Sequence, residues 1–449
     1  MITAIRPKPA AARLYRFPSF TEEVFSSGLR LVVAPVEKLP VVTVLVIIDA
    51  GSTTDVAGKE GLAALTAAAL LEGTSDFDGA QLTEQFERLG TAVESGADWD
   101  SAFVKLTVLV EHLEEATKLL GEAITNPVFP EREIERLKAE RLAEILQLET
   151  EPRGLADEKF SEFLYTGESR YAKPDGGSAE SVAALMRSDV ESFFRSQYRA
   201  ASTTVIIAGA VSQARARKLI ETAFNRWPAG TASGRTLVAS PRETSRTLNI
   251  VDKPDAPQSE LRVGHVGLPR KHPDFFPTLV MNAVLGGLFG SRINMNLREA
   301  HGYTYGASSY YEWRRGPGPF VISTAVQSDV TAPALKEIFA EIDRIRSEKI
   351  SEEELSLARD YLDGVFPIRY ETTTAIASAL ANLVIYGLSG DYYDTYRARV
   401  RQVTTNDVLQ AAKNHLHPER LQTVIVGDAA AIKGSVADQR FGDLRVHSV

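Results

Sequence analysis

The stretch that decides the fold runs from Gly51 to Thr74 and reads GSTTDVAGKEGLAALTAAALLEGT. Its later part is rich in alanine and leucine, which are strong helix formers, and we predict a helix over residues 58–73. β-Branched residues crowd the chain before this stretch, so the segments 28–34 and 41–48 are predicted to form a pair of strands. A strand pair followed by a helix is the opening of an α+β unit.

The second half of the chain repeats the plan of the first, which indicates a duplicated unit. Matching patterns pair 103–109 with 320–326, 113–124 with 332–347, 129–133 with 350–354, and 188–208 with 404–426. We therefore predict an α+β fold of two homologous domains, each with a mixed sheet, over residues 1–227 and 246–449. The segment between them, 228–245, begins with small and turn-forming residues and is predicted to be a linker.

Composition excludes several classes of function. The 449 residues are 44% hydrophobic and 24% charged, as in ordinary globular proteins, and the net charge of −9 argues against a nucleic-acid partner. The chain has no cysteine, which excludes disulfides and a thiol nucleophile. Its most apolar run, residues 41–48, is far too short to span a membrane. Residues 1–27 lack the apolar core of a signal peptide, so the cytoplasm is the expected compartment and the periplasm the alternative.

The frame of residues 51–74 resembles the pitrilysin/insulinase and mitochondrial-processing-peptidase family. In that family a GS…GxxGLAHFLEHMLFxGT segment carries an inverted HxxEH zinc motif. Laid on that frame, the two histidines fall at Ala64 and Ala68, and the glutamate between them falls at Ala67. The third zinc ligand of the family falls at Glu144, and a second, assisting acidic position falls at Leu137. The resemblance extends from about residue 25 to residue 428.

These positions do not offer the atoms that zinc needs. Alanine methyl groups carry no lone pair, and a lone carboxylate cannot hold zinc against water. We therefore expect no metal in this chain and no peptide hydrolysis by this chain alone. The simpler interpretation, in which the alanines favour a buried helix and Glu144 is a solvated helix residue, leads to the same expectation. Of the seven histidines, no two form an HxxxH pair, and His415 and His417 are expected at the surface.

A second segment, residues 285–306, reads LGGLFGSRINMNLREAHGYTYG and resembles the family's GGxxSSRLxxxLRExxGLxYxxxS segment. There an arginine and a tyrosine reach across a central chamber toward the zinc-bearing half. They correspond to Arg298 and Tyr305 here. The resemblance also implies that Gly286, Gly287 and Gly290 form a flexible substrate-binding loop and that Arg292 contacts the substrate. The alternatives are a helix salt bridge for Arg298, a strand aromatic for Tyr305, a tight helix entry for the glycines and a surface role for Arg292.

Phenol and guanidinium donors suit the negative charge that develops during peptide hydrolysis. The resemblance thus implies a non-catalytic subunit that forms half of a clamshell peptidase. A homologous partner with an intact HxxEH motif would carry the zinc, and the substrates would be peptides or unfolded proteins. The alternative is a structural or binding protein, comparable to the peptidase-like core subunits of a respiratory complex. Hydrolysis by another nucleophile is not supported, because no GxSxG elbow is present.

Overall fold

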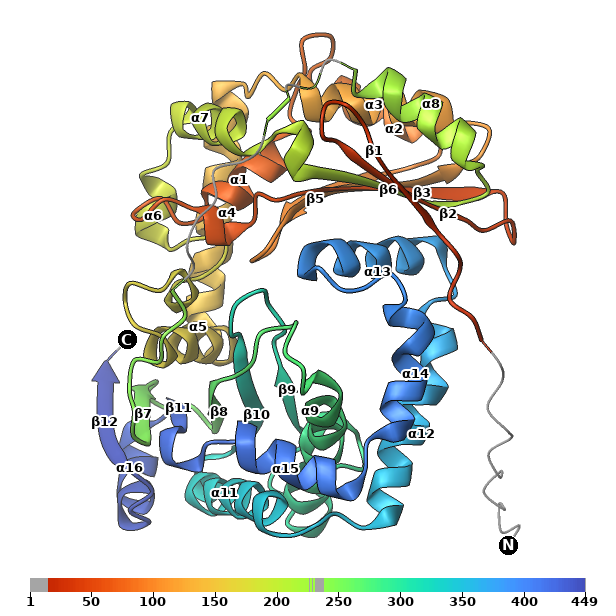
Figure 1. Ribbon diagram of the computed structural model, residues 1–449. Helices are drawn as coiled ribbons and strands as arrows, with labels where there is room; N and C mark the ends of the chain where they lie inside the picture. The colour runs from red at the N-terminus through yellow and green to blue at the C-terminus, as the bar shows by residue number, and fades with distance from the viewer. Residues whose placement is uncertain (1–14, 226, 228, 231–237, 449) are drawn as a thin grey trace, which may run out of the picture.

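The chain forms two six-stranded sheets, one from each half of the sequence, in the computed structural model of Figure 1. The structure describes residues 15–225, 227, 229–230 and 238–448. The predicted linker 228–245 therefore lies partly outside the described residues.

The first sheet has the strand order β1-β2-β6-β3-β5-β4. Its central strand, β3, is buried along almost its whole length, because both faces of the sheet are covered. This explains why β3 is continuously apolar and does not alternate with polar residues. Only the pair β2 and β6 is parallel. The strands are β1 Thr21–Val24, β2 Arg30–Pro35, β3 Val41–Ile48, β4 Val93–Ala97, β5 Ala102–Leu109 and β6 Thr203–Gly209.

The second sheet has the order β12-β7-β11-β8-β10-β9. Five of its strands repeat the arrangement of β2, β6, β3, β5 and β4, which confirms the predicted pair of homologous α+β halves. The sixth strand differs. β1 comes from the start of the chain and is antiparallel to β2, whereas β12 comes from the end and is parallel to β7. The strands are β7 Thr247–Asp252, β8 Gln258–Val266, β9 Ala307–Tyr311, β10 Pro319–Gln327, β11 Gln422–Gly427 and β12 Asp443–Ser448.

Each half also supplies helices to one face of its own sheet. Figure 1 shows α3 and α8 above the first sheet, and α11, α15 and α16 below the second. The first half contains α1 Leu62–Ala69, α2 Gly79–Arg88, α3 Leu113–Thr125, α4 Glu131–Thr150, α5 Pro152–Leu164, α6 Ala179–Ala183, α7 Arg187–Gln197 and α8 Gln213–Ala223. The second half contains α9 Phe275–Asn282, α10 Arg292–Asn294, α11 Thr331–Ser347, α12 Glu352–Arg369, α13 Thr373–Tyr386, α14 Tyr392–Gln402, α15 Thr405–His415 and α16 Ala429–Asp438.

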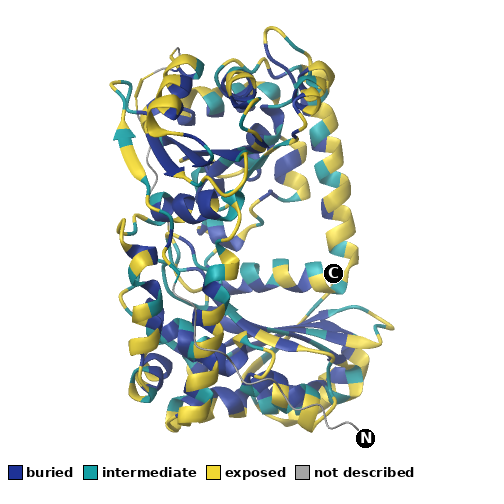
Figure 2. Ribbon diagram, turned by 90° about the vertical axis from the view of Figure 1, so that its right-hand side faces the viewer, coloured by how far each residue is buried: buried dark blue, intermediate teal, exposed yellow. Residues whose placement is uncertain are grey.

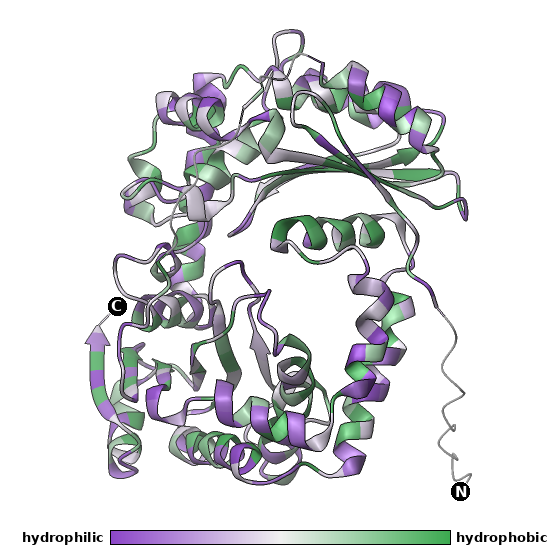
Figure 3. Cartoon of the chain, viewed as in Figure 1, coloured by the Kyte–Doolittle hydropathy of each residue, from purple (hydrophilic) through white to green (hydrophobic). Residues whose placement is uncertain are grey.

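The two halves exchange a helix. α13, from the second half, packs on β3 and β6 of the first sheet, on the face opposite α3 and α8. α5, from the first half, packs on β8 and β11 of the second sheet. Both sheets are therefore buried on two faces, as the dark sheets of Figure 2 show, and α13 is apolar along most of its length in Figure 3. The hydrophobic effect thus holds the halves together as well as each half separately.

Most predicted elements lie within a few residues of the observed ones, with two instructive differences. The helix predicted over 58–73 is shorter, because Gly61 adopts a left-handed backbone (φ 95°) and α1 begins only at Leu62. A proline such as Pro152 is typical of a helix end in sequence, and α4 does end there, but the helix resumes at once as α5, with Pro152 in the first turn where proline is tolerated. Among the described residues, no helix combines the length and apolar character needed to cross a membrane.

Candidate functional site

The positions that correspond to the zinc motif lie on α1, in the first half. Ala64 and Ala68 are one helical turn apart and half-buried, whereas Ala67 is fully buried in the core of this half. α1 packs against α4, the helix that carries Glu144. The structure therefore brings the four predicted positions onto two adjoining helices, as a zinc site of this kind requires.

The side chains at these positions do not fit a zinc ion. Glu144 is 64% exposed, and its carboxylate is paired with Arg141 Nη1 at 3.1 Å. Leu137, seven residues earlier on α4, packs against the hydrophobic core of the first half. Of the predicted ligand positions, only Glu144 offers a donor atom, and zinc in proteins requires three or four protein ligands.

The N-terminus of α1 is held by charged groups. The Asp55 carboxylate, which is buried, accepts hydrogen bonds from the backbone N–H groups of Gly61 (2.9 Å) and Ala63 (2.8 Å). It also forms an ion pair with Arg170 at 2.9 Å. A Cβ at Gly61 would lie 2.6 Å from the Gly176 carbonyl oxygen, so only glycine allows the loop and the helix to approach this closely. α1 is therefore firmly positioned although it carries no metal ligand.

Arg298 and Tyr305 lie on the second half, in the segment between α9 and β9. Tyr305 is 94% exposed, in the turn just before β9. Arg298 belongs to a π-helical turn, Met295–Ala300, and its side chain is 38% exposed. Its guanidinium lies over the ring of Phe289, 4.8 Å from the centroid, and 3.4 Å from the Glu299 carboxylate. Phe289 is itself largely exposed, so this segment presents two aromatic rings and a guanidinium to solvent.

The three glycines of the segment have different environments. Gly286 is buried, and a Cβ there would lie 2.5 Å from the backbone nitrogen of Ser309 on β9. This close approach gives Gly286 a packing role, and the burial keeps a substrate away from it in this conformation. Gly287 and Gly290 are exposed, and a Cβ at Gly290 would meet only Leu357 within 4 Å. A substrate contact therefore remains a prediction for Gly287 and Gly290.

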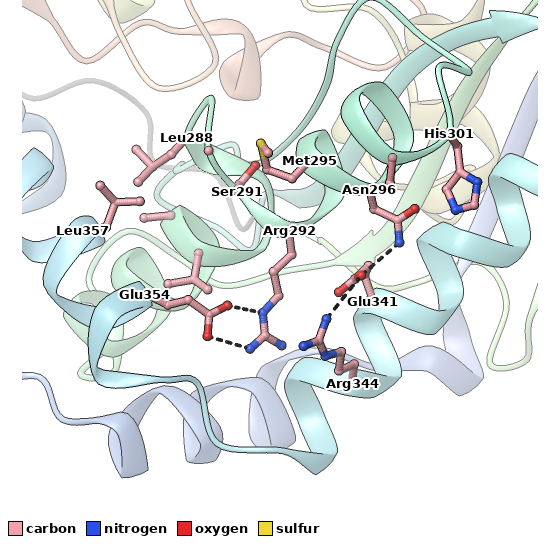
Figure 4. Close-up of a pocket in the computed structure, with 14 residues that line it drawn as sticks. Leu288, Ser291, Arg292, Met295, Asn296, His301, Glu341, Arg344, Glu354 and Leu357 are labelled. Atoms are coloured by element: carbon pink, nitrogen blue, oxygen red, sulfur yellow. Dashed lines mark hydrogen bonds and ion pairs between the residues drawn. The ribbon is translucent and has the colours of Figure 1, made fainter. Parts of the chain in front are cut away.

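A pocket of about 440 Å³ lies beside this segment and is shown in Figure 4. Gly290 and Arg292 line it, but Arg292 is held by two hydrogen bonds to Glu354, at 2.6 and 3.0 Å. These bonds lower the pKa of Glu354 to about 2. With its Nε and one Nη committed to Glu354, Arg292 has a structural role that the sequence alone did not reveal. Its predicted contact with a substrate depends on its remaining nitrogen.

That remaining nitrogen, Arg292 Nη1, is one of several buried polar atoms around the pocket without a hydrogen-bond partner among the described residues. The others are Ser291 Oγ, Asn296 Oδ1 and Glu341 Oε2. Buried polar atoms are normally paired, so these four are unsatisfied hydrogen-bonding groups in this conformation. Asn296 Nδ2 donates a hydrogen bond to Glu341 Oε1 at 3.0 Å, although the two residues lie 45 positions apart in the sequence. No sequence motif has this spacing, so the sequence does not predict the contact.

Both halves of the chain are similar to proteins of one peptidase family. The family model described as insulinase (peptidase family M16) matches residues 31–171, and the model described as peptidase M16 inactive domain matches residues 184–362. A crystal structure of a peptidase M16 inactive domain from Pseudomonas fluorescens has a TM-score of 0.86 and 25% identity, and covers 91% of this chain and 98% of that one.

Two curated relatives carry different names. A protein named non-peptidase homolog YmxG from Helicobacter pylori is 24% identical over 84% of this chain and 87% of its own length. A probable mitochondrial-processing peptidase subunit beta from Arabidopsis thaliana is 22% identical over 89% of this chain and 77% of its own length. The similarity thus spans both sheets, including the segments with the alanines of α1 and with Arg298 and Tyr305.

Proposed function

The chain belongs to the insulinase family, peptidase family M16, as a member without the histidines of the zinc motif, and we propose that it is the non-catalytic subunit of a heterodimeric zinc peptidase. In this proposal, a homologous partner with an intact HxxEH motif binds zinc and carries the general base. This chain supplies Arg298 and Tyr305 to the reaction and forms half of the substrate chamber. The substrates are peptides or unfolded proteins.

The observation that carries the proposal is the contrast between two arginines of one segment. Arg292 is buried and bonded twice to Glu354, which accounts for it as a structural residue. Among the described residues, the Arg298 guanidinium contacts the neighbouring Glu299 at 3.4 Å and lies over the largely exposed ring of Phe289, and Tyr305 is almost fully exposed. An exposed phenol and guanidinium contribute little to the stability of this chain, so their position favours a role toward another molecule.

The chemistry of such a pair suits the proposed role. Peptide hydrolysis builds negative charge on the carbonyl oxygen of the bond that is cut, and a phenol O–H donates to that oxygen. A guanidinium grips carbonyl or carboxylate oxygens with two parallel N–H groups. The relative from Arabidopsis thaliana is named as one subunit of a processing peptidase, and this supports an assembly of two related chains.

The test is reconstitution. The chain is mixed with a homologue from the same organism that carries HxxEH, and cleavage of an unfolded peptide is measured for each protein and for the mixture. The proposal expects activity only in the mixture, or a large increase over the partner alone. If the two chains bind but peptide cleavage does not rise, the chain is a scaffold and the proposal is wrong. If they do not bind at all, the proposed partner is wrong.

A further inference from the structure

Three side chains from distant parts of the second half converge between α9 and α15. His272 and Asp274 precede α9, whose N-terminus follows Asp274, and His415 ends α15. One possible ligand atom from each of the three lies within 4.8 Å of the other two. α9 and α15 pack directly against each other, so both helices fix the positions of these groups. None of the three lies in the α1–α4 region.

The contacts within this cluster are close already. His415 Nε2 and Asp274 Oδ2 are 2.7 Å apart, and the rings of His272 and His415 meet edge to face with centroids 5.0 Å apart. His272 Nδ1 accepts a hydrogen bond from the backbone N–H of Asp274 at 3.1 Å, which holds the imidazole ring in place. The His415 side chain is only 11% exposed, whereas the Asp274 side chain is 43% exposed, so solvent reaches the cluster from one side.

We propose that His272, Asp274 and His415 bind a divalent transition-metal ion of the zinc class. Two imidazoles and one carboxylate are a ligand set that zinc uses, with bonds of about 2.0–2.2 Å. Ligand atoms of such a site lie roughly 3–3.5 Å apart. Those of the cluster lie within 4.8 Å of one another, so the most distant pair must approach by about 1–2 Å. The ion replaces the hydrogen bond between His415 Nε2 and Asp274 Oδ2, the proton of that bond passes to solvent water, and water from the open side completes the coordination.

The ligand types of the cluster decide which metal it favours. A neutral imidazole binds a metal through its unprotonated nitrogen. In His272 that nitrogen is Nδ1, which accepts the hydrogen bond from the Asp274 N–H, so the ion must replace this bond or bind Nε2 after the proton moves to Nδ1. Magnesium and calcium prefer sites made of oxygen alone, so the two nitrogens select against them.

A bound ion would join the start of α9 to the end of α15. These helices are separated by more than a hundred residues in sequence, so the link would restrict a long loop of the unfolded chain and stabilise the second half. The site is unrelated in position to the zinc motif of the family, and the inference does not depend on the proposed role in peptide hydrolysis.

The test uses the full-length protein after treatment with a chelator. Zinc and cobalt are titrated by calorimetry, and cobalt binding is followed in the visible spectrum, where tetrahedral cobalt absorbs strongly. We expect one ion per chain, a rise in melting temperature with zinc, and no response to magnesium. His272→Ala and Asp274→Asn should each weaken binding on the order of tenfold or more. Asp274→Asn retains the shape of the side chain, so it separates loss of a ligand from misfolding.

Two controls locate the site. His301→Ala removes an exposed histidine that is paired with Glu337 at 3.9 Å, outside the cluster, and should leave zinc affinity unchanged. Glu144→Gln removes the one donor among the positions that correspond to the zinc motif and should also have no effect. The proposal is overturned if zinc does not bind, if binding survives both His272→Ala and Asp274→Asn, or if Glu144→Gln abolishes it.

Discussion

Asp157 on α5 accepts a hydrogen bond from Arg262 on β8, and this contact joins the first half of the chain to the second. The Arg262 side chain is only 1% exposed, and its remaining N–H groups donate to Glu260, to the Leu261 carbonyl and to the Arg153 carbonyl. A buried guanidinium is costly unless all its donors are paired. α5 therefore covers the second sheet. It also completes the hydrogen bonding of Arg262, the buried arginine of β8 in that sheet.

Asp157→Asn tests this link. The neutral amide is a weaker partner for the buried guanidinium, and we expect the free energy of unfolding to fall by about 1–2 kcal/mol. The measurement is urea denaturation followed by circular dichroism. Glu162→Gln on the same helix is the matched control, because Glu162 forms a partly exposed pair with Lys159 and its loss should cost less than about 1 kcal/mol. Equal losses in the two variants would show that α5 is held by apolar contacts alone.

The pair Arg292–Glu354 predicts an acid-sensitive contribution to stability. The pKa of Glu354 is about 2 in the folded chain, below its ordinary value of 4.5, because Arg292 donates two hydrogen bonds to it. The folded state thus favours the ionised form, and the stabilisation is complete above pH 4.5 and is lost as the pH falls toward 2. Glu354 is partly exposed, so we expect a contribution on the order of 2 kcal/mol.

Glu354→Gln should therefore destabilise the protein at pH 6, and the difference from the parent protein should shrink as the pH falls below 4.5. The free energies of unfolding of both proteins are compared by urea titration between pH 6 and pH 3. Glu352→Gln, an exposed change in the same first turn of α12, is the control and should show no such trend. A difference that stays constant with pH would mean that Arg292 stabilises the charged and neutral forms equally.

The sequence predicts the duplicated α+β plan because strand and helix patterns are local. The run at β3 and the helix of residues 113–125 are recognisable from residues that are close in sequence. The exchange of α5 and α13 between the sheets is not predictable in this way, because an apolar helix face does not specify which sheet it covers. Neither is the edge position of β12, which pairs with a strand about 200 residues earlier.

The candidate sites follow the same rule: residues that lie close together in the sequence can be predicted from it, and residues that only the fold brings together cannot. The alanines of α1 and the Arg298–Tyr305 segment were found because each lies in a compact motif. His272, Asp274 and His415 were missed, since no fixed spacing connects residues that only the packing of α9 on α15 brings together. His415 was expected at the surface, but its side chain is nearly buried. Histidine is amphipathic, and its environment depends on tertiary contacts.

Tyr305→Phe should separate a chemical role from a structural one in the reconstituted enzyme. The phenol is almost fully exposed, so its removal should leave the stability of the chain and its binding to the partner unchanged. If it donates to the developing oxyanion, kcat of the mixture should fall on the order of 10²–10³-fold. Tyr361→Phe, a half-exposed tyrosine on α12, is the control. Unchanged kcat in Tyr305→Phe would exclude the proposed donor.

The buried Asp55–Arg170 pair predicts a structural role for the loop that positions α1. Asp55→Asn leaves the buried Arg170 without its anionic partner and weakens the bonds to the Gly61 and Ala63 N–H groups. We expect a loss of about 3–5 kcal/mol in the free energy of unfolding, measured by chemical denaturation. The exposed Asp76→Asn change should have little effect. A small loss in Asp55→Asn would show that packing alone positions α1.

Restoring the two histidines tests whether α1 and α4 still form the frame of a zinc site. Ala64→His with Ala68→His places two imidazoles one turn apart on α1, and both positions are accessible enough for the larger side chains. Glu144 can serve as the third zinc ligand once its ion pair with Arg141 breaks, so we expect the double variant to gain one zinc ion per chain. The gain is measured by metal analysis in a His272→Ala background, which removes the cluster between α9 and α15.

Adding Glu144→Gln to this variant should abolish the gained zinc, because two histidines alone hold the ion weakly. Peptide hydrolysis should remain absent in both proteins, since the position of the general base is still Ala67 and is buried in the core. Zinc without catalysis would show that two separate losses, of ligands and of base, distinguish this chain from a peptidase. If the double variant binds no zinc, α1 and α4 have diverged in geometry as well as in side chains.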